Sequence, residues 1–148
     1  MRLRRYGLRL LQSSAVMLVA YLFVCLMTSS LRQSPLSLAL PSLGEPDSNS
    51  TFELLLFSVP GQLLFLLACA VLRRRRWLIS AFVLAAGLTA LLQCLLFAEA
   101  FGNTWSNAEI LRLWAFNLPA LLLALIPGLA LFCAVEQISR VRRSHSHG

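Results

Sequence analysis

Long apolar runs alternate with short polar segments along this chain. Four runs have 21 to 23 residues each, and none carries a charge in its interior. About 20 helical residues cross the ~30 Å hydrocarbon core of a bilayer. The runs do not alternate between apolar and polar residues, and lipid cannot satisfy an open backbone, so helix is favoured over strand. The pattern predicts an all-α membrane protein that spans the bilayer over residues 11–31, 52–72, 77–98 and 113–135.

Four consecutive arginines, Arg73, Arg74, Arg75 and Arg76, separate the second run from the third. One continuous helix would place them in lipid, where a central arginine costs about 2.5–3.5 kcal/mol on insertion scales. A tight turn over 73–76 places them in water instead. The second and third spans are then antiparallel neighbours, and residues 1–148 form a single domain, a four-helix transmembrane bundle.

The arginines also orient the chain. Eleven of the thirteen lie in the N-terminal segment, the 73–76 turn and the tail 136–148, whereas the loops 32–51 and 99–112 hold only Arg32 and Arg112. The positive-inside rule places both termini in the cytoplasm, and we expect a multi-pass protein of a bacterial inner membrane. The first run is longer than the core of a signal peptide, which favours an uncleaved anchor. A cleaved signal peptide that leaves three spans is the alternative.

Composition excludes several classes of function. Only 13% of the residues are charged, against about 25% in soluble domains. A net charge of +7 is typical of nucleic-acid binding, but the sequence shows no soluble basic domain to support it. The cysteines lie in apolar runs without a CxxC pair, and both histidines lie in the tail. We therefore expect no enzymatic activity, metal site or cofactor, and no nucleic-acid partner.

Small residues predict which helix faces meet, because membrane helices associate through small and polar side chains. The span 77–98 has two such lines at helical spacing, so we expect it at the centre of the bundle, with Leu and Phe facing lipid. Pro60 and Pro127 lie inside their spans and should kink them. The two lines are Ala86, Ala90, Cys94 and Ala98, and Ala81, Ala85 and Thr89.

Two further local patterns precede the second and fourth spans. Ser50 with Glu53 and Ser106 with Glu109 have the spacing of a capping box, which predicts helix starts. The sequences FSVP (57–60) and FNLP (116–119) follow these boxes. Chance similarity between leucine-rich spans is the favoured explanation, and an internal repeat is the alternative.

Two groups of side chains are candidate functional residues. The first is a polar interior of Tyr21, Gln62, Gln93 and Asn117. These residues either form interhelical hydrogen bonds, worth about 0.6 kcal/mol each, or line an outward-facing vestibule. The second group is basic and can bind anionic lipids, at about 1 kcal/mol per residue near a charged leaflet. It consists of Arg73, Arg74, Arg75, Arg76, Arg140, Arg142 and Arg143.

The layout favours a non-catalytic protein that acts through helix–helix contacts. Its four spans and two cytoplasmic ends resemble the membrane-bound immunity proteins of pore-forming colicins, in topology and not in any motif. Because no motif residue matches, their function is not carried over to this chain. An accessory or assembly subunit and an immunity-like inhibitor of a membrane partner both fit the layout. Its expected partners are lipids and another membrane protein or a second copy. The alternative is a small-solute transporter or channel subunit lined by Gln62, Gln93 and Asn117.

Overall fold

The computed structural model describes residues 2–33, 35, 56–100 and 105–144, all of them helical or in short connections. The prediction of an all-α protein is confirmed, since no strand occurs among these residues. The helices are α1 (Arg2–Arg32), α3 (Val59–Val71), α4 (Arg75–Ala100), α5 (Asn107–Phe116) and α6 (Leu118–Ser144).

Three helices are long and apolar enough to cross a membrane. These are α1, α4 and α6, over Leu3–Leu31, Arg75–Glu99 and Leu118–Arg142. The predicted spans 11–31 and 77–98 are therefore confirmed as helices. The chain is a membrane protein by this measure.

The predicted second span is found only as the short helix α3. Its 13 residues reach about 20 Å at 1.5 Å per residue, less than the hydrocarbon core, and positions 52–55 of the prediction, like the Ser50–Glu53 capping box, lie outside the described residues. The expected kink at Pro60 is wrong, because Pro60 lies in the first turn of α3. A proline is well tolerated there, since the first N–H groups of a helix have no intrahelical partner.

The predicted fourth span is divided at Asn117. The helix α5 occupies part of the predicted loop 99–112, and α6 begins at Leu118 with Pro119 in its first turn. The capping box at Ser106 is confirmed: the Ser106 amide donates to Glu109 Oε2 at 2.7 Å, and the Glu109 amide donates to Ser106 Oγ at 3.4 Å. The Ser106 amide and the Ser106 hydroxyl both donate to Glu109 Oε2, and these two bonds lower the pKa of the Glu109 carboxyl.

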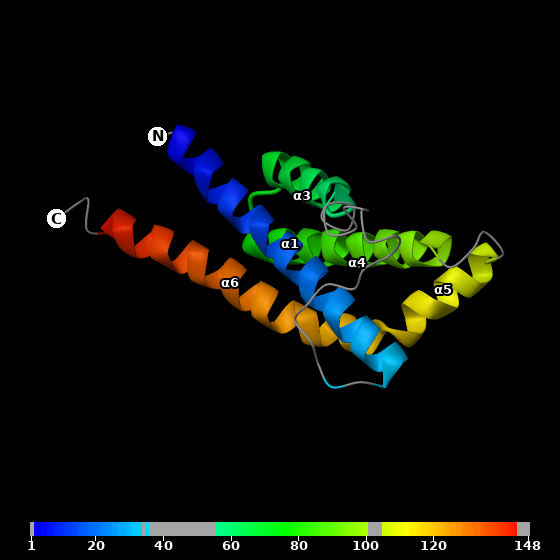
Figure 1. Ribbon diagram of the computed structural model, residues 1–148. Coiled ribbons are helices and arrows are strands. Elements are labelled where there is room, and N and C mark those ends of the chain that lie inside the picture. Colours follow the sequence, from blue (N-terminus) through cyan, green and yellow to red (C-terminus); the bar gives the residue numbers. More distant parts are fainter. Residues whose placement is uncertain (1, 34, 36–55, 101–104, 145–148) are drawn as a thin grey trace.

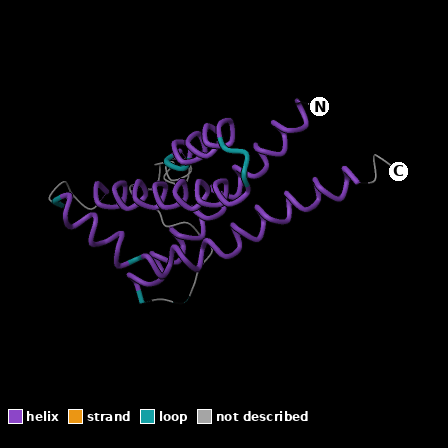
Figure 2. Tube along the Cα trace, turned by 180° about the vertical axis from the view of Figure 1, so that it is seen from behind, coloured by secondary structure: helices purple, strands orange, loops and turns teal. Residues whose placement is uncertain are grey.

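The helices bring three basic segments to one end of the molecule. Figures 1 and 2 show the start of α1, the turn between α3 and α4, and the end of α6 at the same end. We call this the basic end. The turn itself is shorter than predicted, because Arg75 already begins α4. The helix α4 contacts every other described helix, as expected from its small residues.

Two glycines allow the closest helix contacts. A Cβ at Gly61 of α3 would lie 2.9 Å from the Ala85 carbonyl oxygen and would overlap the Thr89 side chain of α4. A Cβ at Gly128 of α6 would overlap the Val19 side chain of α1 and lie 3.6 Å from the Ala15 carbonyl oxygen. Both helix pairs therefore pack backbone against backbone, as small residues permit in membranes.

Phenylalanines fill the core between these contacts. Phe65, Phe82 and Phe132 are fully buried, and their ring centroids lie 5.4–5.9 Å apart, which is the preferred range for aromatic pairs. Phe23 is also fully buried. The expectation that Phe faces lipid is wrong for Phe23, Phe82 and Phe132, because close backbone packing leaves pockets between the helices that large side chains fill.

The two glycine contacts reveal an internal repeat in a register different from the one the sequence suggested. Aligning Gly61 with Gly128 matches VPGQLLF (59–65) to IPGLALF (126–132), which pairs Phe65 with Phe132. The same offset of 67 pairs Arg73 with Arg140. The FSVP and FNLP segments do not match in this register.

The helices α1 and α4 are related to each other in a similar way. The glycine contacts pair Ala15 with Ala85 and Val19 with Thr89, an offset of 70. From Phe82 onward, every buried position of α4 then falls on a buried position of α1. One unit contains α1 and α3, the other α4 and α6. Each unit packs its first helix against the second helix of the other unit.

Replacing either contact glycine should destabilise the bundle. We expect G61A and G128A each to lower the free energy of unfolding by about 1–3 kcal/mol, because the added methyl has no space. A methyl group added at Gly7 of α1 would have no atom within 4 Å, so G7A is the matched control and should leave stability unchanged or raised. Unfolding in detergent micelles measures all three, and equal stability of G61A, G128A and G7A would contradict the packing.

Candidate functional site

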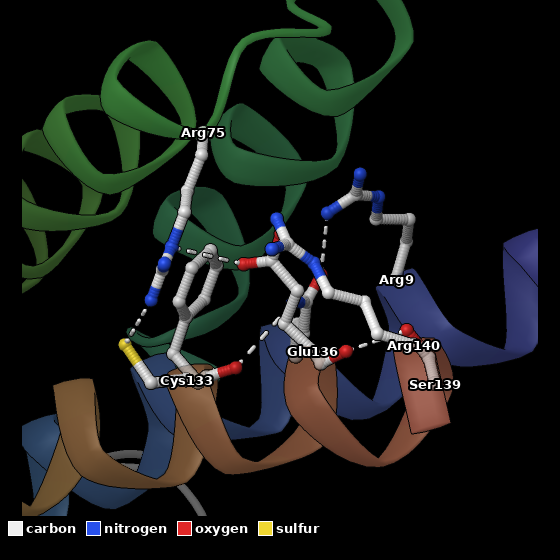
Figure 3. A network of polar contacts seen from close by, with 8 residues as sticks. Arg9, Arg75, Cys133, Glu136, Ser139 and Arg140 are labelled. Atoms are coloured by element: carbon white, nitrogen blue, oxygen red, sulfur yellow. Dashed lines mark hydrogen bonds and ion pairs between the residues drawn. The ribbon is translucent and has the colours of Figure 1, made fainter. Parts of the chain in front are cut away.

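A polar cluster joins three helices at the basic end (Figure 3). Glu136 of α6 lies at its centre, with its side chain only 16% exposed. Its Oε1 accepts a hydrogen bond from Arg140 Nη2 at 3.1 Å, and its Oε2 lies 3.5 Å from Arg75 Nε of α4 in an ion pair. Arg75 Nη2 also donates to Cys133 Sγ at 3.5 Å. One carboxylate thereby fixes guanidinium groups from two helices.

The helix α1 contributes the third guanidinium group. Arg9 Nη1 donates to Gln12 Oε1 at 2.6 Å, and Gln12 Nε2 donates to the Phe132 carbonyl oxygen at 3.5 Å. Gln12 is fully buried. Phe132 precedes Glu136 by one turn of α6, so these bonds hold Arg9 beside the Glu136 cluster.

The internal repeat supplies a comparison for this cluster within the same chain. Arg9, Gln12, Cys133, Glu136 and Ser139 lie where α1 and α6 meet at the basic end. The equivalent positions where α4 and α3 meet are all apolar: Ile79, Phe82, Leu66, Cys69 and Leu72. Since apolar residues support the same helix pairing in the other unit, the fold does not require a polar cluster at this end.

The structure divides the predicted lipid-binding arginines into two groups. Arg75 and Arg140 belong to the cluster. Those outside it are exposed: Arg73, Arg74, Arg76 and Arg142. The Arg143 side chain lies outside the described residues.

Sequence reasoning missed five residues of the cluster (Figure 3): Arg9, Gln12, Cys133, Glu136 and Ser139. Two signals were available. Glu136 is the single acidic residue among the basic segments, and Gln12 is a polar residue at a position where the repeat has Phe82. The second signal depends on the register, which the glycine contacts define.

The four predicted interior residues have different environments. Tyr21 and Gln62 are half-buried, and Gln93 and Asn117 are buried. Asn117 Nδ2 donates to the Leu113 carbonyl oxygen at 2.8 Å. Asn117 therefore stabilises the break between α5 and α6, and its amide nitrogen is committed to its own segment rather than to Gln62 or Gln93.

Gln93 differs from the other three. Its side chain is 2% exposed, and its Oε1 has no hydrogen-bond partner among the described residues. Trp114 Nε1 is likewise buried and has no hydrogen-bond partner among the described residues. A buried polar atom without a partner carries a desolvation cost of about 1–3 kcal/mol. Among the described residues, no three His, Cys, Asp or Glu side chains come together as metal ligands.

Comparison with protein-family models, with curated proteins and with solved structures found no match to this chain. Its candidate sites are therefore defined by its own geometry and by the comparison between its two units.

Replacing Gln93 should stabilise the chain if its amide has only a structural role. We expect Q93L to raise the free energy of unfolding by about 1–3 kcal/mol, because the unpartnered oxygen is removed. The half-buried Gln62 is the control, and Q62L should produce a smaller change. Unfolding in micelles checks both variants, and a loss of stability in Q93L would show that the amide makes a bond that leucine cannot replace.

Proposed function

We propose that this chain is a non-catalytic integral membrane protein that acts by contact of its helices with a second membrane protein. Such a protein acts either as an accessory or assembly subunit or as an immunity-like inhibitor of its partner. We also propose the four-span arrangement predicted from the sequence, with the apolar run 52–72 as the second crossing.

The open face of α6 carries the proposal. Only 33% of the most apolar stretch of α6 is buried inside the molecule, whereas the buried share of the corresponding stretch of α1 is 56%. Along this face, exposed residues recur every three or four positions, and most of them are small. The line consists of Pro127, Ala130, Ala134 and Gln137. Small residues let a second backbone approach closely, and an amide can hydrogen-bond across the contact.

The internal repeat distinguishes this line from an ordinary lipid-facing surface. The positions of α3 equivalent to Ala130 and Ala134 are Leu63 and Leu67, which are also exposed. Leucine is as apolar as lipid and suits a surface without a protein partner. The α6 line is therefore the better candidate for a helix–helix contact.

The arginine distribution supports a location in a bacterial inner membrane with the basic end in the cytoplasm. Arginines are concentrated at the termini and at the α3–α4 turn, and cytoplasmic segments carry this excess. In this orientation the α6 line crosses the inner half of the bilayer and ends at Gln137 near the cytoplasmic surface.

A transporter or channel subunit is the second candidate, and the observation that favours it is the buried Gln93 Oε1, which has no hydrogen-bond partner among the described residues. A buried amide within a span can bind a polar solute. Under this alternative Q93L abolishes flux of the solute in reconstituted vesicles, whereas under the first proposal it leaves partner binding intact.

Adding bulk along the α6 line should release the partner. We expect A130L/A134L to reduce recovery of the partner from membranes solubilised in mild detergent by at least about tenfold, equivalent to 1.4 kcal/mol. The measurement compares the amounts of protein co-purified with the wild-type chain and with the variant.

Two controls accompany this experiment. A70L replaces one exposed alanine of α3 with leucine, half the bulk added in A130L/A134L, and should leave recovery unchanged. Unfolding of A130L/A134L should match the wild type, because both alanines are exposed. Equal recovery with A130L/A134L and with the wild type would overturn the α6 contact.

A further inference from the structure

The basic end holds more positive charge than its single carboxylate neutralises. Arg75 of α4 and Arg140 of α6 pair with Glu136, and Arg9 of α1 is tied to the same stretch of α6 through Gln12 and the Phe132 carbonyl oxygen (Figure 3). The cluster of three guanidinium groups and one carboxylate has a net charge of +2. Because Arg75 and Arg140 are 49% and 63% exposed while Glu136 is 16% exposed, the positive groups face the aqueous side and the carboxylate lies beneath them.

The hydrogen bonds within the cluster leave donors for a ligand. Each arginine has five N–H donors and no acceptor. Glu136, Cys133 and Gln12 engage one or two donors of each guanidinium group. The remaining donors can exchange water for an anionic ligand, and arginine matches the geometry of phosphate oxygens especially well.

The buried carboxylate fits the role of a positioning group. It holds Arg75 and Arg140 together before any ligand arrives, which reduces the entropy lost when long side chains are ordered on binding. The equivalent position in the other unit is Cys69. That unit packs without an acid, so helix packing alone does not account for Glu136.

We propose that Arg9, Arg75 and Arg140 form a binding site for a phosphate group at the basic end, positioned by Glu136 and Gln12. The phosphate comes from an anionic lipid headgroup or from free phosphate in the cytoplasm. This inference does not depend on the α6 contact, since the site and the Pro127–Gln137 line use different residues.

The internal repeat supplies a matched control for the test. Arg73 is the equivalent of Arg140, and Arg5 is the equivalent of Arg75. Together with Arg74 they are exposed arginines at the same end, outside the cluster. The variants R9Q/R75Q/R140Q and R5Q/R73Q/R74Q each remove three positive charges, so a general attraction to anions weakens equally in both.

The experiment measures phosphatidylglycerol bound to the full chain in phosphatidylcholine nanodiscs that contain a small fraction of that lipid. We expect R9Q/R75Q/R140Q to bind at least tenfold less lipid than the wild type and R5Q/R73Q/R74Q to lose less than twofold. A second arm titrates inorganic phosphate into nanodiscs of phosphatidylcholine alone. Binding in this arm with the same dependence on the variants would identify free phosphate as the source.

Two results would overturn the site. Equal losses of bound lipid in both triple variants would show that the binding is general attraction between charges. If the wild type binds neither the lipid nor inorganic phosphate, the basic end has no phosphate site. If R9Q/R75Q/R140Q does not fold, the single variants R140Q and R73Q replace the triple variants. R140Q should then lose more bound phosphate than R73Q, and equal binding by these two would also reject the site.

Discussion

Close approach of backbones at Gly61 and Gly128 determines the packing of the other helices. Lipid is as apolar as leucine, so these helices gain little by hiding apolar surface from it and must gain from close contact instead. The absent side chains bring α3 onto Ala85 and α6 onto Ala15. The space that remains between the four helices is filled by Phe65, Phe82 and Phe132.

These contacts are similar because α3 and α6 carry the related segments VPGQLLF (59–65) and IPGLALF (126–132). Phe65 and Phe132 occupy equivalent positions in these segments, and their ring centroids lie 5.9 Å apart. Both units run in the same direction, as in parallel repeats of membrane proteins. Where equivalent positions differ, the chain carries a feature that packing alone does not need. Glu136 opposite Cys69 and Ala130 opposite Leu63 are two such differences.

The sequence alone predicted the features that depend on length and charge. The apolar runs predicted the helices α1 and α4, and the arginines at 73–76 predicted the turn between α3 and α4. It did not predict the role of Pro60, because a proline inside an apolar run has the same sequence pattern whether it starts a helix or kinks one. Nor did it predict the buried phenylalanines, since their apolar character suits lipid and core equally.

The candidate site was predicted only in part for a related reason. Arg75 and Arg140 were recognised as basic residues near the membrane, but nothing local separates them from Arg73 or Arg76. The separation depends on Glu136, which lies 61 positions from Arg75 in the sequence and meets it only when α4 and α6 pack together. Gln12 likewise belongs to the cluster only because it donates a hydrogen bond to the Phe132 carbonyl oxygen, which requires α1 and α6 to pack together.

A double-mutant cycle at Phe65 and Phe132 tests the two-unit packing most directly. The free energies of unfolding of F65L, F132L and the double variant in micelles give the coupling between the two rings. Direct contact between the two rings predicts a coupling of about 0.5–1.5 kcal/mol, the range for aromatic pairs. Additive losses, within the ~0.3–0.5 kcal/mol expected for distant sites, would contradict the packing of the two units around these rings.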